Sequence, residues 1–237
     1  MSSPFASEAP TAAAVSAVAE RTFLRQVFAW MLLGLALTTG VAVYLASSND
    51  VAQYFADHSG AYWVLIIVQF GAVIALTAAL PRISGNTAAL LFCVYAGLTG
   101  VVFAILFEVY SSADVAFAFA GATGVFGGMA LYGYATKRDL SSWGGILFGA
   151  LIGLIVASVV FIFVGGSTFN LILGFFGVII FAGLTAYDMQ KIKEIGAKGI
   201  AHGDTAQKLA IFGALALYLD FINLVISLLR IFGGSSR

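Results

Sequence analysis

The chain has 237 residues, of which 61% are hydrophobic and only 9% are charged, and its eleven basic and eleven acidic residues give a net charge of zero. A soluble domain is about 45–50% apolar and about 25% charged, so the composition excludes an ordinary soluble protein. The balanced charge gives no indication of a nucleic-acid partner, and the single cysteine, Cys93, excludes an internal disulfide and a cysteine metal cluster.

The first 20 residues are rich in alanine, serine and proline and contain no hydrophobic signal-peptide core. They predict a disordered tail in front of one transmembrane domain, residues 21–237. Seven apolar segments follow, each of about 20 residues, which is enough to cross about 30 Å of hydrocarbon as a helix. Their short connections predict an all-α, polytopic membrane protein in which neighbouring helices are antiparallel. The segments are Phe23–Ala46, Tyr62–Leu80, Thr87–Tyr110, Val115–Tyr134, Trp143–Val164, Phe169–Met189 and Leu209–Phe232.

The basic residues predict that the N-terminus lies in the cytoplasm, because positively charged loops stay on that side. Arg230 and Arg237 would then lie outside if the last segment crosses fully, as its length favours; a last helix that does not cross completely is the alternative. The nine other basic residues fall on one side: Arg21, Arg25, Arg82, Lys137, Arg138, Lys191, Lys193, Lys198 and Lys208.

Small residues recur at every fourth position in two of the segments. Such spacing lets the backbones of membrane helices approach closely. We expect packing within the chain, and hence a monomer; a homodimer face is the alternative. The residues are Gly124 and Gly128 in one segment, and Gly145, Gly149 and Gly153 in the next.

Asp220 lies about eleven residues into the last apolar segment. An ionisable side chain at this depth costs several kcal/mol and usually serves a function. Tyr218 and Asn223 add polar groups nearby, and Asn223 shares the helix face of Asp220. The functional interpretation is part of an ion or proton pathway. The alternative is a structural carboxylate that is hydrogen-bonded inside the bundle.

Asp188 lies at the edge of the sixth segment, three residues before Lys191. It could simply form an interfacial ion pair with that lysine. If it meets Asp220, however, the two carboxylates cannot both ionise at low cost, and the pair would titrate as a unit and sense pH. Hydropathy places Asp220 about 10 Å deeper than Asp188. Contact therefore requires that the last helix protrudes or that the sixth is sunk inward.

Two further charged residues stand at segment ends. Arg82 closes the second segment on the basic side, where a contact with Asp188 could latch two helices together; ordinary basic flanking is the alternative. Glu108 stands near the other end of the third segment, either as an interfacial residue or as an acid that attracts cations to an outer mouth.

Four stretches resemble the Bax inhibitor-1 (transmembrane Bax-inhibitor-motif) family, in its bacterial branch. They are FLRQVFAWMLLGLALTTG (Phe23–Gly40), GGMALYGYATKRDLSSWG (Gly127–Gly144), GLTAYDMQKIK (Gly183–Lys193) and LALYLDFINLVISLLRIFG (Leu215–Gly233). The resemblance implies a bundle whose last helix is central and wrapped by the other six, in a bacterial inner membrane.

The resemblance also implies a pH-sensitive calcium leak channel. By motif, the sensor and gate would be Asp188 and Asp220, which could contact Ca²⁺ transiently, and the latch would be Arg82. Tyr187, Tyr218 and Asn223 would be supporting polar groups. No cofactor is implied beyond the permeant ion. A glutamate that the family often carries about three turns before the arginine is replaced here by glutamine at position 69, so an acidic calcium contact is absent there.

Two other function classes are weaker. Bacterial relatives are thought to modulate a membrane-bound quality-control protease and eukaryotic ones to suppress cell death, and the N-terminal tail could bind such a partner. An intramembrane aspartyl protease would match at Tyr187-Asp188. However, the glycines required before the second aspartate are absent from Leu217–Leu219, and no proline follows Pro81. We therefore expect no enzymatic activity.

Overall fold

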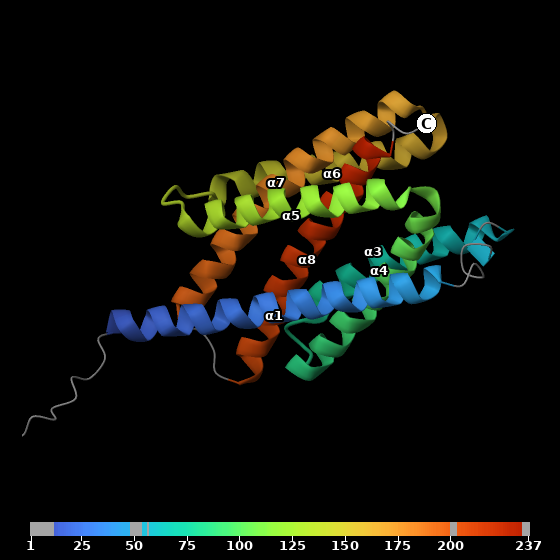
Figure 1. Cartoon of the computed structure of the whole chain (residues 1–237). Coiled ribbons are helices and arrows are strands. Elements are labelled where there is room, and N and C mark those ends of the chain that lie inside the picture. Colours follow the sequence, from blue (N-terminus) through green and yellow to red (C-terminus); the bar gives the residue numbers. More distant parts are fainter. Residues whose placement is uncertain (1–11, 48–53, 56, 200–202, 234–237) are drawn as a thin grey trace, which may run out of the picture.

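A computed structural model describes residues 12–47, 54–55, 57–199 and 203–233. Within these residues the chain forms seven helices and no strand (Figure 1). Every predicted segment corresponds to one of these helices. They are α1 (Ala12–Ala46), α3 (Ser59–Ala79), α4 (Gly85–Val109), α5 (Ser112–Ala135), α6 (Ser141–Val164), α7 (Ser167–Ala197) and α8 (Asp204–Phe232).

The first helix begins earlier than the sequence predicted. Residues 12–20, expected in the disordered tail, are the first turns of α1. They are rich in alanine, the residue with the highest helix propensity, so the helix extends beyond its apolar part. The rest of the expected tail, residues 1–11, lies outside the described residues.

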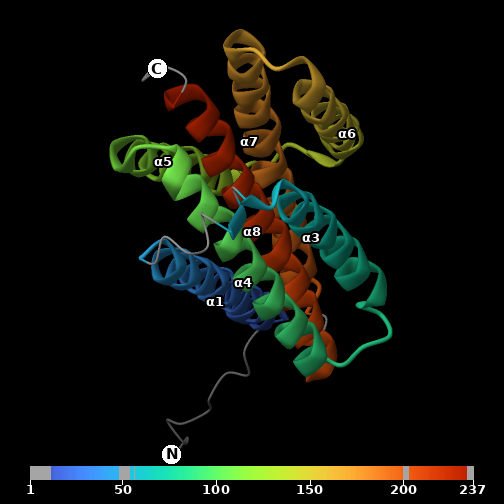
Figure 2. The same cartoon turned by 90° about the vertical axis from the view of Figure 1, so that its right-hand side faces the viewer.

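The last helix, α8, occupies the middle of the bundle. It packs against α7, α1, α5 and α4, and it crosses the centre of the molecule in both views (Figure 2). Leu217, Leu224 and Val225 on this helix are completely buried. The central position implied by the resemblance is confirmed. Wrapping by six helices is only partly present, because α3 packs mainly on α4 and α6 mainly on α7.

The outer surface is that of a membrane protein. Six of the described helices are long and apolar enough to span a bilayer, and α3 holds a shorter apolar stretch, Trp63–Ala79. No residue of α6 is buried, and Phe163 on this helix is 84% exposed. A helix that exposes so much apolar surface needs an apolar solvent. The protein is therefore an all-α polytopic membrane protein.

Close helix packing occurs at glycines other than those singled out by spacing. A Cβ at Gly133 of α5 would overlap the backbone carbonyl of Ala186 in α7. By contrast, a Cβ would meet open space at all five glycines with four-residue spacing, so the prediction of intrachain packing there is wrong. Their spacing places them on a common face, but it does not determine which face meets a neighbouring helix. These five are Gly124, Gly128, Gly145, Gly149 and Gly153.

Candidate functional site

Asp220 is buried in the centre of the bundle. Its side chain belongs to α8 and is 4% exposed. Its Oδ2 atom is buried and has no hydrogen-bond partner among the described residues. Leaving a buried polar atom unpaired costs about 1–3 kcal/mol. Asp220 is therefore held at a cost to stability, as is common for functional groups.

The structure brings Asp188 and Asp220 together. Asp188 is half-buried on α7, and its carboxyl group lies within hydrogen-bonding reach of that of Asp220. An ionised carboxylate only accepts hydrogen bonds, so a bond between two carboxyl groups requires a proton on one of them. This arrangement allows the two carboxyl groups to share a proton.

The α7–α8 hairpin explains how residues predicted at different depths meet. Gly213 of α8 lies against Ile192 of α7. From this contact, Asp188 lies four residues earlier on α7, and position 217 lies four residues later on α8. Because the two helices are antiparallel, Asp188 is level with position 217, about one helical turn from Asp220. The hydropathy estimate placed Asp188 at a helix end, but α7 continues to Ala197 and α8 already begins at Asp204. Both helices extend beyond their apolar segments.

The basic residues expected near Asp188 have other positions. Arg82 is exposed in the turn after α3, a helix that packs mainly on α4 rather than on α7. The structure therefore does not bring Arg82 to the pair. Lys191 pairs with Glu194 at 3.1 Å instead of with Asp188. Neither Arg82 nor Lys191 therefore neutralises the aspartate pair.

The expected supporting groups also face elsewhere. Asn223 donates through Nδ2 to the carbonyl of Leu219 at 2.8 Å, within its own helix. Tyr187 lies against Gly144 at the start of α6. Glu108 is exposed, next to the end of α4.

Tyr218, expected to support the aspartate pair, instead joins a buried polar network whose other members the sequence did not predict. The hydroxyl groups of Tyr218 and Thr38 are 2.6 Å apart, and Thr38 also donates to the carbonyl of Ala96 at 2.9 Å. Gln69 of α3 donates to the hydroxyl of Thr99 at 3.2 Å. The available signal was the occurrence of a threonine or glutamine inside apolar segments, where such groups must find partners.

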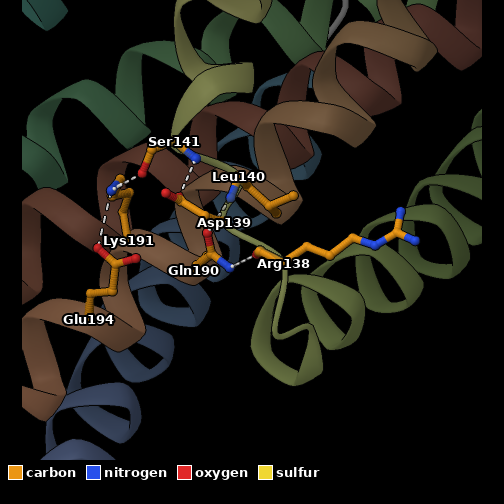
Figure 3. Close-up of polar contacts among 7 residues, drawn as sticks. All are labelled: Arg138, Asp139, Leu140, Ser141, Gln190, Lys191 and Glu194. Atoms are coloured by element: carbon orange, nitrogen blue, oxygen red, sulfur yellow. Dashed lines mark hydrogen bonds and ion pairs between the residues drawn. The ribbon is translucent and has the colours of Figure 1, made fainter.

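The α5–α6 connection is fixed to the polar end of α7 (Figure 3). Gln190, 8% exposed, accepts from the backbone N–H of Leu140 and donates to the carbonyl of Arg138, both at 2.8 Å. Lys191 donates to the hydroxyl of Ser141 at 2.8 Å. These bonds leave the polar end of α7 little freedom to move independently of the connection.

Comparison with known proteins agrees with this architecture. The sequence model of a family described as "Inhibitor of apoptosis-promoting Bax1" matches residues 20–237. The chain belongs to this Bax inhibitor-1 family. The resemblance inferred from the four stretches is therefore confirmed.

Family members from distant bacteria match almost the whole chain. The inner membrane protein YbhL of Escherichia coli K12 is 45% identical over 216 residues, which cover 90% of this chain and 92% of the relative. An uncharacterized protein of Deinococcus radiodurans is 43% identical over 217 residues, covering 92% and 91%. The uncharacterized protein RP147 of Rickettsia prowazekii is 38% identical over 215 residues, covering 90% of each. The first relative and the six apolar helices support an integral inner-membrane protein.

Proposed function

We propose that this Bax inhibitor-1 family member is a pH-sensitive cation leak channel, whose sensor and gate are Asp188 and Asp220. The observation that carries the proposal is the proximity of their carboxyl groups on adjacent helices, with one oxygen of Asp220 buried and without a partner among the described residues. One carboxyl oxygen of the pair therefore receives no hydrogen bond from the described residues around it. It can gain or lose a proton without dismantling another contact.

Loss of the shared proton changes the contact between α7 and α8. Two carboxylates 4 Å apart repel each other by about 4 kcal/mol at an effective dielectric constant of 20. Two conformations of a protein commonly differ by only a few kcal/mol. The charge on this one pair is therefore large enough to select between two arrangements of the central helix.

A doubly ionised pair also attracts a cation. Carboxylate oxygens are the ligands that Ca²⁺ prefers, and calcium is the permeant ion we propose.

Glu108, exposed at the far end of α4, would raise the local cation concentration there, and Arg82 would reach the pair only in another conformation. The basic residues orient the N-terminus toward the cytoplasm.

Calcium flux into proteoliposomes, measured across a pH series, tests the proposal. Asp188→Asn and Asp220→Asn should each flatten the pH dependence, because an amide donates to the remaining carboxylate without a titrating proton. Asp139→Asn is the matched control. Asp139 lies in the α5–α6 connection, where the backbone N–H of Ser141 holds the pKa of its carboxyl below the ordinary value. It therefore stays ionised near neutral pH in the wild type.

The control variant should keep the wild-type pH profile. An unchanged profile in both pair variants would contradict the sensor role, whatever the size of the flux.

A further inference from the structure

An apolar groove lies between α1 and α5. It has a volume of about 400 Å³. The groove is lined by Leu24 and Phe28 of α1, by Gly127, Leu131 and Tyr134 of α5, and by Met189 of α7. In Figure 1, α8 passes behind the space between α1 and α5.

The groove has a buried floor and an exposed wall. Met189 is 3% exposed and forms part of the floor, whereas Leu131 is 69% exposed at the rim. A cavity of this size corresponds to a small-molecule site. It is too small for another helix, whose diameter with side chains is about 10 Å. An apolar chain of small cross-section fits it.

Positive charge gathers at one end of the groove. Tyr134 is the next-to-last residue of α5, and the Lys193 ammonium lies 4.7 Å from its ring centroid. The same ammonium donates to the Tyr134 backbone carbonyl at 2.8 Å. Arg21 and Arg25, both exposed, flank Leu24 on α1. A tyrosine beside cationic side chains at a helix end is typical of the boundary between hydrocarbon and headgroups.

We propose that this groove is a binding site for an anionic phospholipid. One acyl chain lies along Leu24, Phe28 and Leu131 and reaches Met189, and the phosphate binds Lys193 and Arg25. Basic residues near the membrane surface attract anionic lipids over zwitterionic ones, and the apolar lining accepts the chain. This inference does not depend on the proposed channel function.

Gly127 offers a direct way to fill the groove. A Cβ at this position meets open space and Gly127 lines the groove, so Gly127→Leu places a side chain in the groove. Gly128→Leu is the matched control, because its Cβ also meets open space and Gly128 does not line the groove. Lys193→Gln removes the charge and keeps a donor for the Tyr134 carbonyl.

Native mass spectrometry of the full chain in detergent, with phosphatidylglycerol or phosphatidylethanolamine of the same acyl chains added, measures retained lipid. The wild type and Gly128→Leu should retain one phosphatidylglycerol in preference to phosphatidylethanolamine, and Gly127→Leu should lose it. Lys193→Gln should weaken phosphatidylglycerol retention about fivefold, as expected for one cation near a lipid surface, and leave phosphatidylethanolamine unchanged.

Equal retention of the two lipids by the wild type would overturn the proposal, because only a nonspecific lipid shell would then be present. Equal loss of lipid in the Gly127 and Gly128 variants would do the same. Circular dichroism identifies which variants fold. If Gly127→Leu does not fold, the lipid preference of Lys193→Gln decides: an undiminished preference for phosphatidylglycerol contradicts the site.

Discussion

A single methyl group added at Gly133 should destabilise the bundle by about 1–3 kcal/mol or more, as expected for overpacking against atoms that cannot move away. The added Cβ would overlap the carbonyl oxygen of Ala186, which is backbone within α7 and cannot rotate aside. The two helices must then separate. Since Ala186 is two residues before Asp188, the change should also disturb the aspartate pair.

Thermal unfolding in detergent, followed by circular dichroism, measures the effect of Gly133→Ala. Gly124→Ala is the control, because Gly124 lies on the same helix and its Cβ would meet open space. In an exposed helix position, alanine is more favourable than glycine by up to about 1 kcal/mol, so the control should be slightly stabilised. Equal unfolding temperatures for the two variants would contradict the close α5–α7 contact.

Replacing Asp220 by leucine should raise the stability of the protein and remove the pH response of the flux. The aspartate is buried, one of its oxygens has no partner in the part of the chain that the structure describes, and removing such a group recovers about 1–3 kcal/mol. Asp188 is half-buried, so leaving its carboxylate without a partner costs less free energy than leaving the buried Asp220 without one. Asp188→Leu should have the opposite effect on stability, because it leaves the buried Asp220 without its hydrogen bond.

The opposite signs of these two substitutions separate a functional carboxylate from a structural one. Both variants can be compared by thermal unfolding in the same detergent, at a pH near neutral. Strong destabilisation by Asp220→Leu would mean that the carboxyl group holds the bundle together. The structural interpretation would then replace the functional one.

Most of the fold could be predicted from hydropathy, because each membrane helix must be a long apolar segment. The helix ends could not. Residues Gln190–Ala197, a stretch rich in polar side chains, continue α7 past its apolar part, and the alanine-rich residues 12–20 extend α1 in the same way. Hydropathy detects contact with lipid, whereas the backbone hydrogen bonds of a helix continue wherever propensity and packing allow.

The aspartate pair was predicted because charge inside an apolar segment is costly and therefore conspicuous. The neighbours of the pair were harder to predict from the sequence. The polar partners of Tyr218 are neutral hydroxyl groups such as Thr38, which are common in membrane helices and carry little signal in a sequence. The expected contact of Arg82 depended on which helices are neighbours in space. That information requires the three-dimensional arrangement of α3 and α7.

The central claim is that Asp188 and Asp220 share one titrating proton that controls permeation. Infrared difference spectroscopy of the reconstituted protein detects the carbonyl stretch of a protonated carboxyl group directly. The wild type should show this band near neutral pH and lose it over the same pH interval in which calcium flux changes, and Asp188→Asn and Asp220→Asn should each remove it. A band that survives both substitutions, or that titrates in a different interval from the flux, would contradict the claim.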